Sequence, residues 1–430
     1  MKISNLVLCG TLLLLAITCH FVSAFEKCTG QPNTKPFVIA EDNMTLMKQV
    51  KNGKLYKVNK QSADTYMYVL HVWGEPKEMG IAHGQLFKEE LGNLLKTYMD
   101  YLDKFIGKYI PYLPEYWKEL VAKYGLNAAL DLTWEATRLY TPQRFIDEIQ
   151  GISEGSGIPE AQVRRLNMLP ELIKAGCSMA GVWGEATSKT KNGTLLQLRA
   201  LDWDDKAPIS EYPTLVVYHP NEGNTFVNVA YPSFVGTITG VSETMLGISE
   251  KVWLGHDDGF DSRIGKPWNY VLRDIMQYTY DLDSAISSLA NTHRTCSIHI
   301  GVGDSVTNRF AGIEYSYKEL NIYDWSTQPE YQEHPRMKDV VYWDKHVQPS
   351  HHPCLGSLMK DYYANYTAEA FMQYIAPIHE TGNAQLAVYD FDAKRMYVAY
   401  SKPPNTDGPT EAYKRQAIAF DLTRLFAEKQ

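Results

Sequence analysis

The chain has 430 residues, with 42 Lys or Arg against 50 Asp or Glu, and its formal net charge at pH 7 is −8. The basic residues form no cluster, which argues against nucleic acid or an anionic membrane surface as the main partner. The length allows a large hydrophobic core in one or two domains, and an aromatic content of 12% is typical of a packed protein rather than a disordered one.

The N-terminal segment predicts entry into the secretory pathway. Lys2 precedes an uncharged apolar run over residues 6–22, and Val22-Ser23-Ala24 offers small residues for cleavage. The run is short for a membrane span, and no later stretch contains about eighteen apolar residues without a charge. We therefore expect residues 1–24 to be a signal peptide. The remaining chain is expected to be secreted or lysosomal, without an integral membrane segment.

That compartment makes N-glycosylation possible. Three Asn-X-Ser/Thr sequences supply candidate sites, at Asn43, Asn192 and Asn365.

The cysteines are too few for a disulfide-built scaffold. After residue 24 the chain contains only Cys28, Cys177, Cys296 and Cys354. If Cys177 is kept for chemistry, at most one bridge forms. We favour Cys28 with Cys354, because Cys296 lies in a strand-like run and is expected to be a buried thiol.

The part of the chain before Cys177 is predicted to be mainly helical. Residues 25–63 are polar and irregular, and the weak alternation over 66–72 predicts an edge strand. Apolar residues then recur at helical spacing. The predicted helices cover residues 85–108, 116–123, 127–139, 142–152 and 159–168. Residues 25–176 are therefore expected to form a helical N-terminal chain.

After Cys177 the apolar period shifts towards two, and short β-rich runs alternate with turns. Strands are predicted at 195–201, 214–218, 225–229, 234–239, 297–302, 311–315, 339–343, 385–389 and 395–400. Helices are predicted at 267–278, 282–290 and 368–374. Strand runs with helix pairs between them indicate an α+β layered fold over residues 177–430.

Cys177 is the candidate nucleophile. Cysteine is among the most buried residue types, so an inert core thiol is the alternative. Gly176, however, leaves no side-chain bulk beside the carbonyl that the Cys177 thiolate would attack to cut its own preceding peptide bond. Cleavage between Gly176 and Cys177 would free an α-amine, whose ordinary pKa is about 8 and which can act as the base for the thiol.

Arg199 and Asp202 end the next strand-like run, which a turn at residues 191–193 would return towards Cys177. The aspartate can hold the new α-amine. The arginine can orient the aspartate or meet the polar end of a substrate. A surface ion pair is the alternative interpretation.

A serine nucleophile is a competing possibility. Gly151-Ile-Ser153-Glu-Gly155 matches the nucleophile elbow of α/β-hydrolases, which requires a strand before it and a helix after it. Here a helical pattern precedes the serine and a turn follows, so the sequence disfavours Ser153.

A metal site is a further possibility that the sequence disfavours. His346, His351 and His352 lie close to Asp344, but an adjacent histidine pair in a Pro/Ser loop lacks the helical spacing that places two imidazoles on one ion. We expect a surface loop there, and neither a metal nor an organic cofactor.

The central motifs resemble the start of the catalytic chain in N-terminal-nucleophile (Ntn) hydrolases. The matching residues are Gly176-Cys177-Ser178, the Asn192-Gly193 turn and Arg199-Ala-Leu-Asp202-Trp203. The branch that matches best is the acyl-coenzyme A:6-aminopenicillanic-acid (isopenicillin-N) acyltransferase family, related to acid ceramidase, N-acylethanolamine acid amidase and the bile-salt hydrolases. Further similar segments lie at residues 80–84, 149–157, 166–167, 234–240, 247–250 and 381–382.

This resemblance implies a set of roles and an architecture. Cys177 corresponds to the nucleophile, Arg199 and Asp202 to its charged partners, and Glu250 to a supporting carboxylate. The implied fold is a four-layer αββα sandwich with a helical pro-region. Self-cleavage would leave a heterodimer of residues 25–176 and 177–430. The implied substrate is a small N-acyl amide, with lipid amides such as N-acylethanolamines and ceramides as candidates, and acyl transfer to an amine is possible where water is excluded.

Two departures concern the oxyanion site and the residue beside Arg199. Relatives usually carry an Asn in a later strand, where this chain has Val341-Tyr342-Trp343-Asp344, so backbone N–H groups, Tyr342 or another side chain would have to stabilise the oxyanion. Ala200 also stands where relatives often have Asn. The alternatives are an ester or phospholipase B-like hydrolase on the same nucleophile and a catalytically silent, uncut binding protein of this fold.

Overall fold

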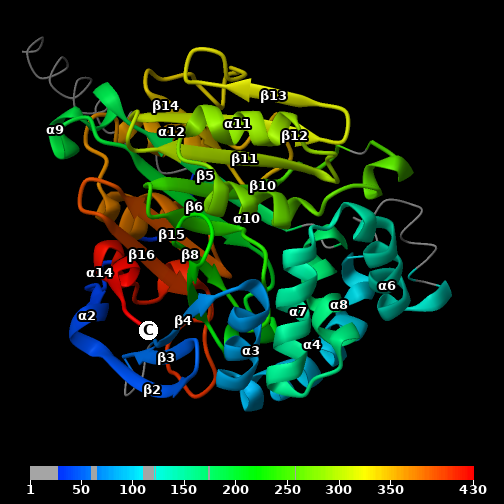
Figure 1. The fold of residues 1–430 in the computed structure, drawn as a ribbon. Coiled ribbons are helices and arrows are strands. Elements are labelled where there is room, and N and C mark those ends of the chain that lie inside the picture. The colour runs from blue at the N-terminus through cyan, green and yellow to red at the C-terminus, as the bar shows by residue number, and fades with distance from the viewer. Residues whose placement is uncertain (1–27, 60–64, 110–120, 122, 173–174, 257) are drawn as a thin grey trace, which may run out of the picture.

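The computed structural model describes residues 28–430 except 60–64, 110–120, 122, 173–174 and 257. The expected signal peptide and most of the helix predicted at 116–123 lie outside the described residues. The described chain forms two large β-sheets with helices, the α+β class that the sequence predicts (Figure 1).

The first sheet has seven strands and contains the stretch that begins at Gly176. The strands are, in spatial order, β1 (Val38–Ile39), β17 (Ile418–Asp421), β16 (Arg395–Tyr400), β15 (Gln385–Asp390), β6 (Leu196–Asp202), β5 (Gly176–Val182) and β14 (Val340–Trp343). Strand β5 pairs antiparallel with both β6 and β14, so Cys177 is the second residue of a strand that has a neighbour on each side.

The second sheet has ten strands and receives three of them from the N-terminal region. In order they are β13 (Leu320–Tyr323), β12 (Arg309–Ser316), β11 (Ser297–Asp304), β10 (Leu246–Val252), β9 (Thr239–Ser242), β8 (Phe226–Ala230), β7 (Thr214–Pro220), β4 (Met67–Gly74), β3 (Gly53–Val58) and β2 (Met44–Val50). The predicted irregular structure over residues 25–63 is therefore wrong for β2 and β3. Most of β2 is exposed at the sheet edge, and its polar residues carry no burial signal.

Two further strand predictions need correction. Strand β4 is not an edge strand, because it pairs antiparallel with β3 and parallel with β7 and is largely buried. A strand buried on both faces shows only weak alternation. The predicted strand at 234–239 is mostly irregular structure that follows a turn at Ser233, whose φ is 73°, and β9 begins only at Thr239.

The helices of the N-terminal region other than α2 lie together on one side of the molecule, and α2 lies apart from them (Figure 1). Their bounds are α2 (Ala40–Asn43), α3 (Pro76–Leu86), α4 (Lys88–Tyr109), α6 (Leu126–Thr137), α7 (Gln143–Ser156) and α8 (Glu160–Leu172). The later helices are α9 (Ser188–Lys191), α10 (Trp268–Tyr278), α11 (Leu282–Ala290), α12 (Pro353–Asp361), a π-helix (Ala370–Ile375), α13 (Ala376–His379) and α14 (Leu422–Ala427). None of the helices described is long and apolar enough to cross a bilayer.

Glycines allow α3 and α7 to touch backbone to backbone. Gly80 and Gly84 on α3 face Gly151 and Gly155 on α7, and a Cβ added to Gly151 would lie 2.4 Å from the Lys77 carbonyl oxygen. The four-residue spacing places both glycines of each helix on one face. This contact accounts for two of the glycine segments noted in the sequence.

The apolar core of the described chain has three parts. One lies between the sheets and joins side chains such as Met179 and Val341 to Val69 and Val217. The largest packs the ten-stranded sheet against α3, α4, α6 to α8, α10 and α11. The third packs the other face of the seven-stranded sheet against α12, α13 and the π-helix.

The structure pairs Cys28 with Cys354 in a disulfide, the pairing favoured from the sequence, and Cys296 is a buried free thiol. The bridge joins the segment before β1 to α12 across 326 positions of sequence. The three candidate glycosylation residues are all exposed: Asn43, Asn192 and Asn365.

Candidate active site

Strands β5 and β6 bring the predicted residues to one end of a hairpin. Gly176 lies opposite Asp202, and Met179 lies opposite Arg199. Opposed residues share a face of the sheet, so Arg199 and Cys177 lie on the same face as Met179, which belongs to the core between the sheets. The connection is longer than the predicted turn, because a 3-10 turn and α9 precede the positive-φ residues Asn192 and Gly193.

Arg199 stands between the thiol and a carboxylate. Its Nη2 lies 3.6 Å from Cys177 Sγ and 3.4 Å from Glu250 Oε2. All three residues are buried, with exposed fractions of 0% for Cys177 and Arg199 and 3% for Glu250. Nε and Nη1 of Arg199 have no hydrogen-bond partner among the described residues. The guanidinium therefore keeps donors for negative charge that develops beside the thiol.

Burial governs the ionisation of this group. It raises the pKa of the Cys177 thiol to about 12, although Arg199 acts in the opposite direction. Burial also raises the pKa of Glu250 to about 7, again opposed by Arg199. In the continuous chain the thiol is thus protonated at neutral pH, so a nucleophilic attack requires that another group take the proton from the sulfur.

Asp202 is fixed at the end of β6 by the loop before β15. Thr381 Oγ1 donates to one carboxylate oxygen at 2.5 Å, and the Gly382 N–H donates to the other at 2.9 Å. The Thr381 hydroxyl also lies 2.7 Å from the Ser178 hydroxyl. Burial raises the pKa of Asp202, opposed first by the charge of Lys345. Asp202 is thereby held opposite Gly176, the residue that precedes the peptide bond whose cleavage the sequence predicts.

The structure therefore divides the predicted site residues between two groups, although the sequence allowed a direct contact of Arg199 with Asp202. Cys177, Arg199 and Glu250 form one contact set, and Arg199 reaches Glu250 rather than Asp202. Asp202 belongs to a neighbouring set with Thr381 and Gly382.

Sequence reasoning missed the strand that supplies Glu250, and with it Lys251. Lys251 Nζ donates to the backbone oxygens of Val252 and His346, each at 3.2 Å, and burial lowers its pKa. Its charge also lowers the pKa of the Cys177 thiol. The sequence does contain a signal for a strand here, because the apolar residues Leu246, Ile248 and Val252 stand at alternating positions of β10.

An apolar pocket opens beside this group. Its lining consists of Tyr98, Leu169, Pro170, Ala175, Arg199, Leu201, Trp203, Ile209, Tyr231, Ile238, Glu250, Val252 and Trp268. It contains about 530 Å³ of space not filled by atoms, part of it open to solvent. Among the described residues that line it, only Arg199 and Glu250 are charged, so an apolar group can lie in the pocket with a polar end directed at them.

Two other residues considered from the sequence, Ser153 as a nucleophile and Tyr342 as an oxyanion donor, lie in surroundings that do not fit these roles. Ser153 lies inside α7, and its hydroxyl donates to the Ile158 carbonyl at 2.6 Å, so the strand that a nucleophile elbow requires is missing. The Tyr342 hydroxyl donates to the Pro335 carbonyl at 3.1 Å, and its ring stacks on His334. Tyr342 is therefore not available to an oxyanion at Cys177.

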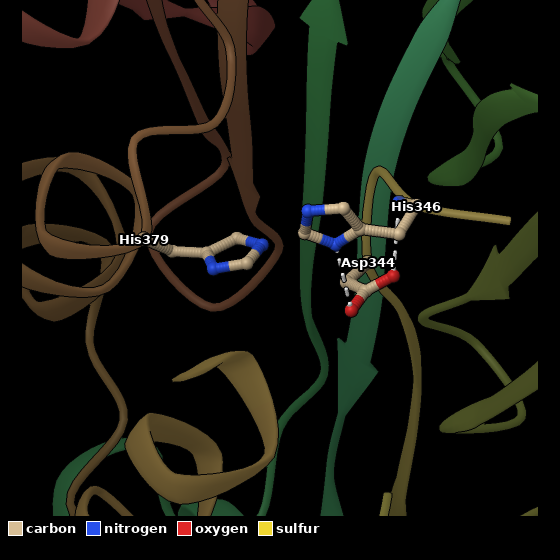
Figure 2. Close-up of side chains that lie close together, drawn as sticks. All are labelled: Asp344, His346 and His379. Carbon is tan, nitrogen blue, oxygen red and sulfur yellow. Dashed lines mark hydrogen bonds and ion pairs between the residues drawn. The ribbon is translucent and has the colours of Figure 1, made fainter. Parts of the chain in front are cut away.

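The expected surface loop after β14 is only partly a surface loop. His351 and His352 are exposed, but Asp344 is buried and lies close to His346 and to His379, which ends α13 (Figure 2). His379 is too distant in sequence for a spacing pattern to associate it with Asp344.

Comparison with known proteins found relatives along nearly the whole chain, although no family model matches. Protein dcd1B of Dictyostelium discoideum is 40% identical over 398 residues, which cover 88% of this chain and 78% of that protein. Protein dcd1A of the same organism is 36% identical over 454 residues, which cover 99% of this chain and 100% of that protein. Among solved structures, the Caenorhabditis elegans ortholog of N-acylethanolamine-hydrolyzing acid amidase is similar with a TM-score of 0.40 and 13% identity, covering 56% of this chain and 98% of that one. The two Dictyostelium alignments include the sequence on both sides of Gly176.

Proposed function

The chain belongs to the family of the Dictyostelium discoideum proteins dcd1A and dcd1B, and we propose that it is a self-processing amide hydrolase whose nucleophile is Cys177. The contact of Arg199 with both the Cys177 thiol and Glu250, at the polar end of an apolar pocket, is the observation that carries this proposal.

Processing would begin in the uncut chain. The Cys177 sulfur attacks the Gly176 carbonyl carbon, and the amide nitrogen takes the thiol proton as the C–N bond breaks. Water then hydrolyses the thioester, which leaves a Gly176 carboxylate, a free thiol and the α-amine of Cys177. The position of Asp202 is an argument for this step. The residue lies opposite Gly176, and its carboxylate is held by Thr381 and Gly382.

Turnover would use the new amine as base. The amine takes the thiol proton, the sulfur bonds to the acyl carbon of the substrate, and the substrate amine leaves with that proton. Water releases the acid by the same exchange. The N–H groups of Arg199 that lack partners in the described chain are our candidates for binding the oxyanion, in place of the asparagine that the sequence lacks.

The pocket supports an apolar acyl group as the substrate class. Tyr98, Trp203 and Tyr231 line it together with aliphatic side chains. Burying each methylene of an acyl chain is worth about 0.8 kcal/mol, so the pocket favours aliphatic N-acyl amides over short polar ones. We further propose a secreted or lysosomal glycoprotein with the four-layer αββα arrangement, in which residues 25–176 and 177–430 form a heterodimer.

End-group analysis of the reduced, secreted protein tests the processing step. We expect two chains, the second starting at Cys177, and a single chain for Cys177→Ala, because the attacking sulfur is gone. Cys296→Ala, which removes the other free thiol, is the matched control and should be cut normally. A normal cut in Cys177→Ala would sink self-processing.

A substrate panel tests the reaction. The processed protein should release fatty acid from aliphatic N-acyl amides, and preincubation with a thiol alkylator should abolish the release. Hydrolysis confined to matched esters would instead indicate an esterase on the same thiol. Absence of release from either set, in protein that is cut, would contradict the proposed turnover and leave only the processing reaction.

A further inference from the structure

The loop after β14 and the end of α13 bring together three side chains that can ligate a metal. A carboxylate oxygen of Asp344 and one ring nitrogen each of His346 and His379 all lie within 4.8 Å of one another. Figure 2 shows the His379 ring directed from its helix towards the other two side chains. The group lies outside the contact set of Cys177, Arg199 and Glu250.

The polar side-chain atoms of His379 are not satisfied by any hydrogen bond within the described structure. It is only 3% exposed, and neither of its ring nitrogens has a hydrogen-bond partner among the described residues. Buried polar groups are nearly always satisfied, and an unpaired one indicates a water or an ion at the site. His346 Nδ1 lies 3.2 Å from Asp344 Oδ2 but has no hydrogen-bond partner among the described residues, and this contact leaves His379 unsatisfied.

Asp344 is already oriented as a ligand would be. The His346 backbone N–H and the Gln348 side-chain amide each donate to Oδ1 at 3.0 Å, and the Ser350 hydroxyl donates to Oδ2. Metal-ligating carboxylates are typically held by hydrogen bonds of this kind. The buried carboxylate also supplies a negative charge next to two imidazoles.

We propose that Asp344, His346 and His379 form a binding site for one divalent transition-metal ion of the Zn²⁺ class. Two imidazoles and one carboxylate are a ligand set that Zn²⁺ accepts, with the fourth position left to water. Ligand atoms about 2.1 Å from a tetrahedral ion lie about 3.4 Å from one another, so the ligand atoms, now within 4.8 Å of one another, need to approach by up to about 1.4 Å. The His346 side chain is 38% exposed and has room to turn.

Such an ion would connect two segments that also approach the candidate active site. The His346 carbonyl accepts from Lys251 Nζ, and Thr381, two residues after His379, binds Asp202. The ion would act there as a structural tie, on residues that the proposed chemistry does not use. The site is independent of the proposed hydrolase, so Cys177→Ala protein should bind the metal equally well.

Zinc titration by calorimetry tests the site, with protein that carries no polyhistidine tag and has been stripped with a chelator. We expect one Zn²⁺ per chain, no saturable binding in His379→Gln, and at least tenfold weaker binding in His346→Gln. Co²⁺ should give a visible absorption band in the wild type that His379→Gln loses. His351→Gln is the control, because His351 is exposed and contacts Glu333 outside the cluster.

Three outcomes would overturn the proposal. The first is the absence of saturable Zn²⁺ binding in the wild type. The second is binding that both His346→Gln and His379→Gln retain unchanged. The third is binding that His351→Gln weakens as much as they do, which would place the ion on the exposed loop. If buried His379→Gln fails to fold by circular dichroism, the partly exposed His346→Gln decides the question.

Discussion

Burial and an incomplete ion pair act in opposite directions on the pKa of Glu250. Its Oε2 meets Arg199, while its other oxygen has no partner among the described residues. Burial therefore outweighs the guanidinium and raises the pKa of Glu250 from 4.5 to about 7. The folded protein then binds a proton that the unfolded chain has already lost at pH between these two values.

The free energy of unfolding should consequently fall as pH rises from about 4.5 to about 7 and level off above it. The contribution of Glu250 to this fall is about 3 kcal/mol. Glu250→Gln, which has the same size and cannot ionise, should remove it. Urea unfolding at a series of pH values, in the Cys177→Ala chain that is expected to stay uncut, measures the difference. Exposed Glu222→Gln should keep the whole fall. An equal fall in Glu250→Gln would contradict the assignment.

At the scale of elements, the contact of α3 with α7 depends on glycine. An added Cβ at Gly151 meets the backbone oxygen of Lys77 at 2.4 Å, so relief requires the helices to separate. We expect Gly151→Ala to lower the free energy of unfolding by about 1–3 kcal/mol. A Cβ added at Gly92 in α4 has no neighbour within 4 Å in the described part of the chain, so Gly92→Ala should raise the free energy of unfolding by about 0.5–1 kcal/mol. Urea unfolding that ranks Gly151→Ala with or above Gly92→Ala would refute the close contact.

Elements with a strong local signal were predictable from the sequence, and those that depend on tertiary partners were not. Helix α11 has the predicted bounds, 282–290, because Asp281 caps an apolar periodic segment by accepting from the Ser284 N–H. Strand β2 escaped prediction because its exposed edge gives polar residues no penalty. The approach of His379 to Asp344 was also invisible, since the fold alone joins α13 to the loop after β14.

At the scale of the whole molecule, the region before Gly176 is inseparable from the region after it. Strand β4 pairs in parallel with β7 inside the ten-stranded sheet, and β1 pairs with β17 in the seven-stranded one. The disulfide between Cys28 and Cys354 adds a covalent link across the proposed cleavage site. Cutting the Gly176–Cys177 bond therefore cannot release either part without breaking a sheet.

Processed protein should accordingly run as one species in denaturing electrophoresis without reductant and as two species with it. When Cys28 and Cys354 are both changed to Ala, denaturing electrophoresis should separate the parts even without reductant. Gel filtration of that variant under native conditions should still elute one complex, because the ladders between β4 and β7 and between β1 and β17 remain. Two species from the wild type without reductant would exclude the disulfide. Native separation of the double variant would show that strand pairing alone does not hold the molecule together.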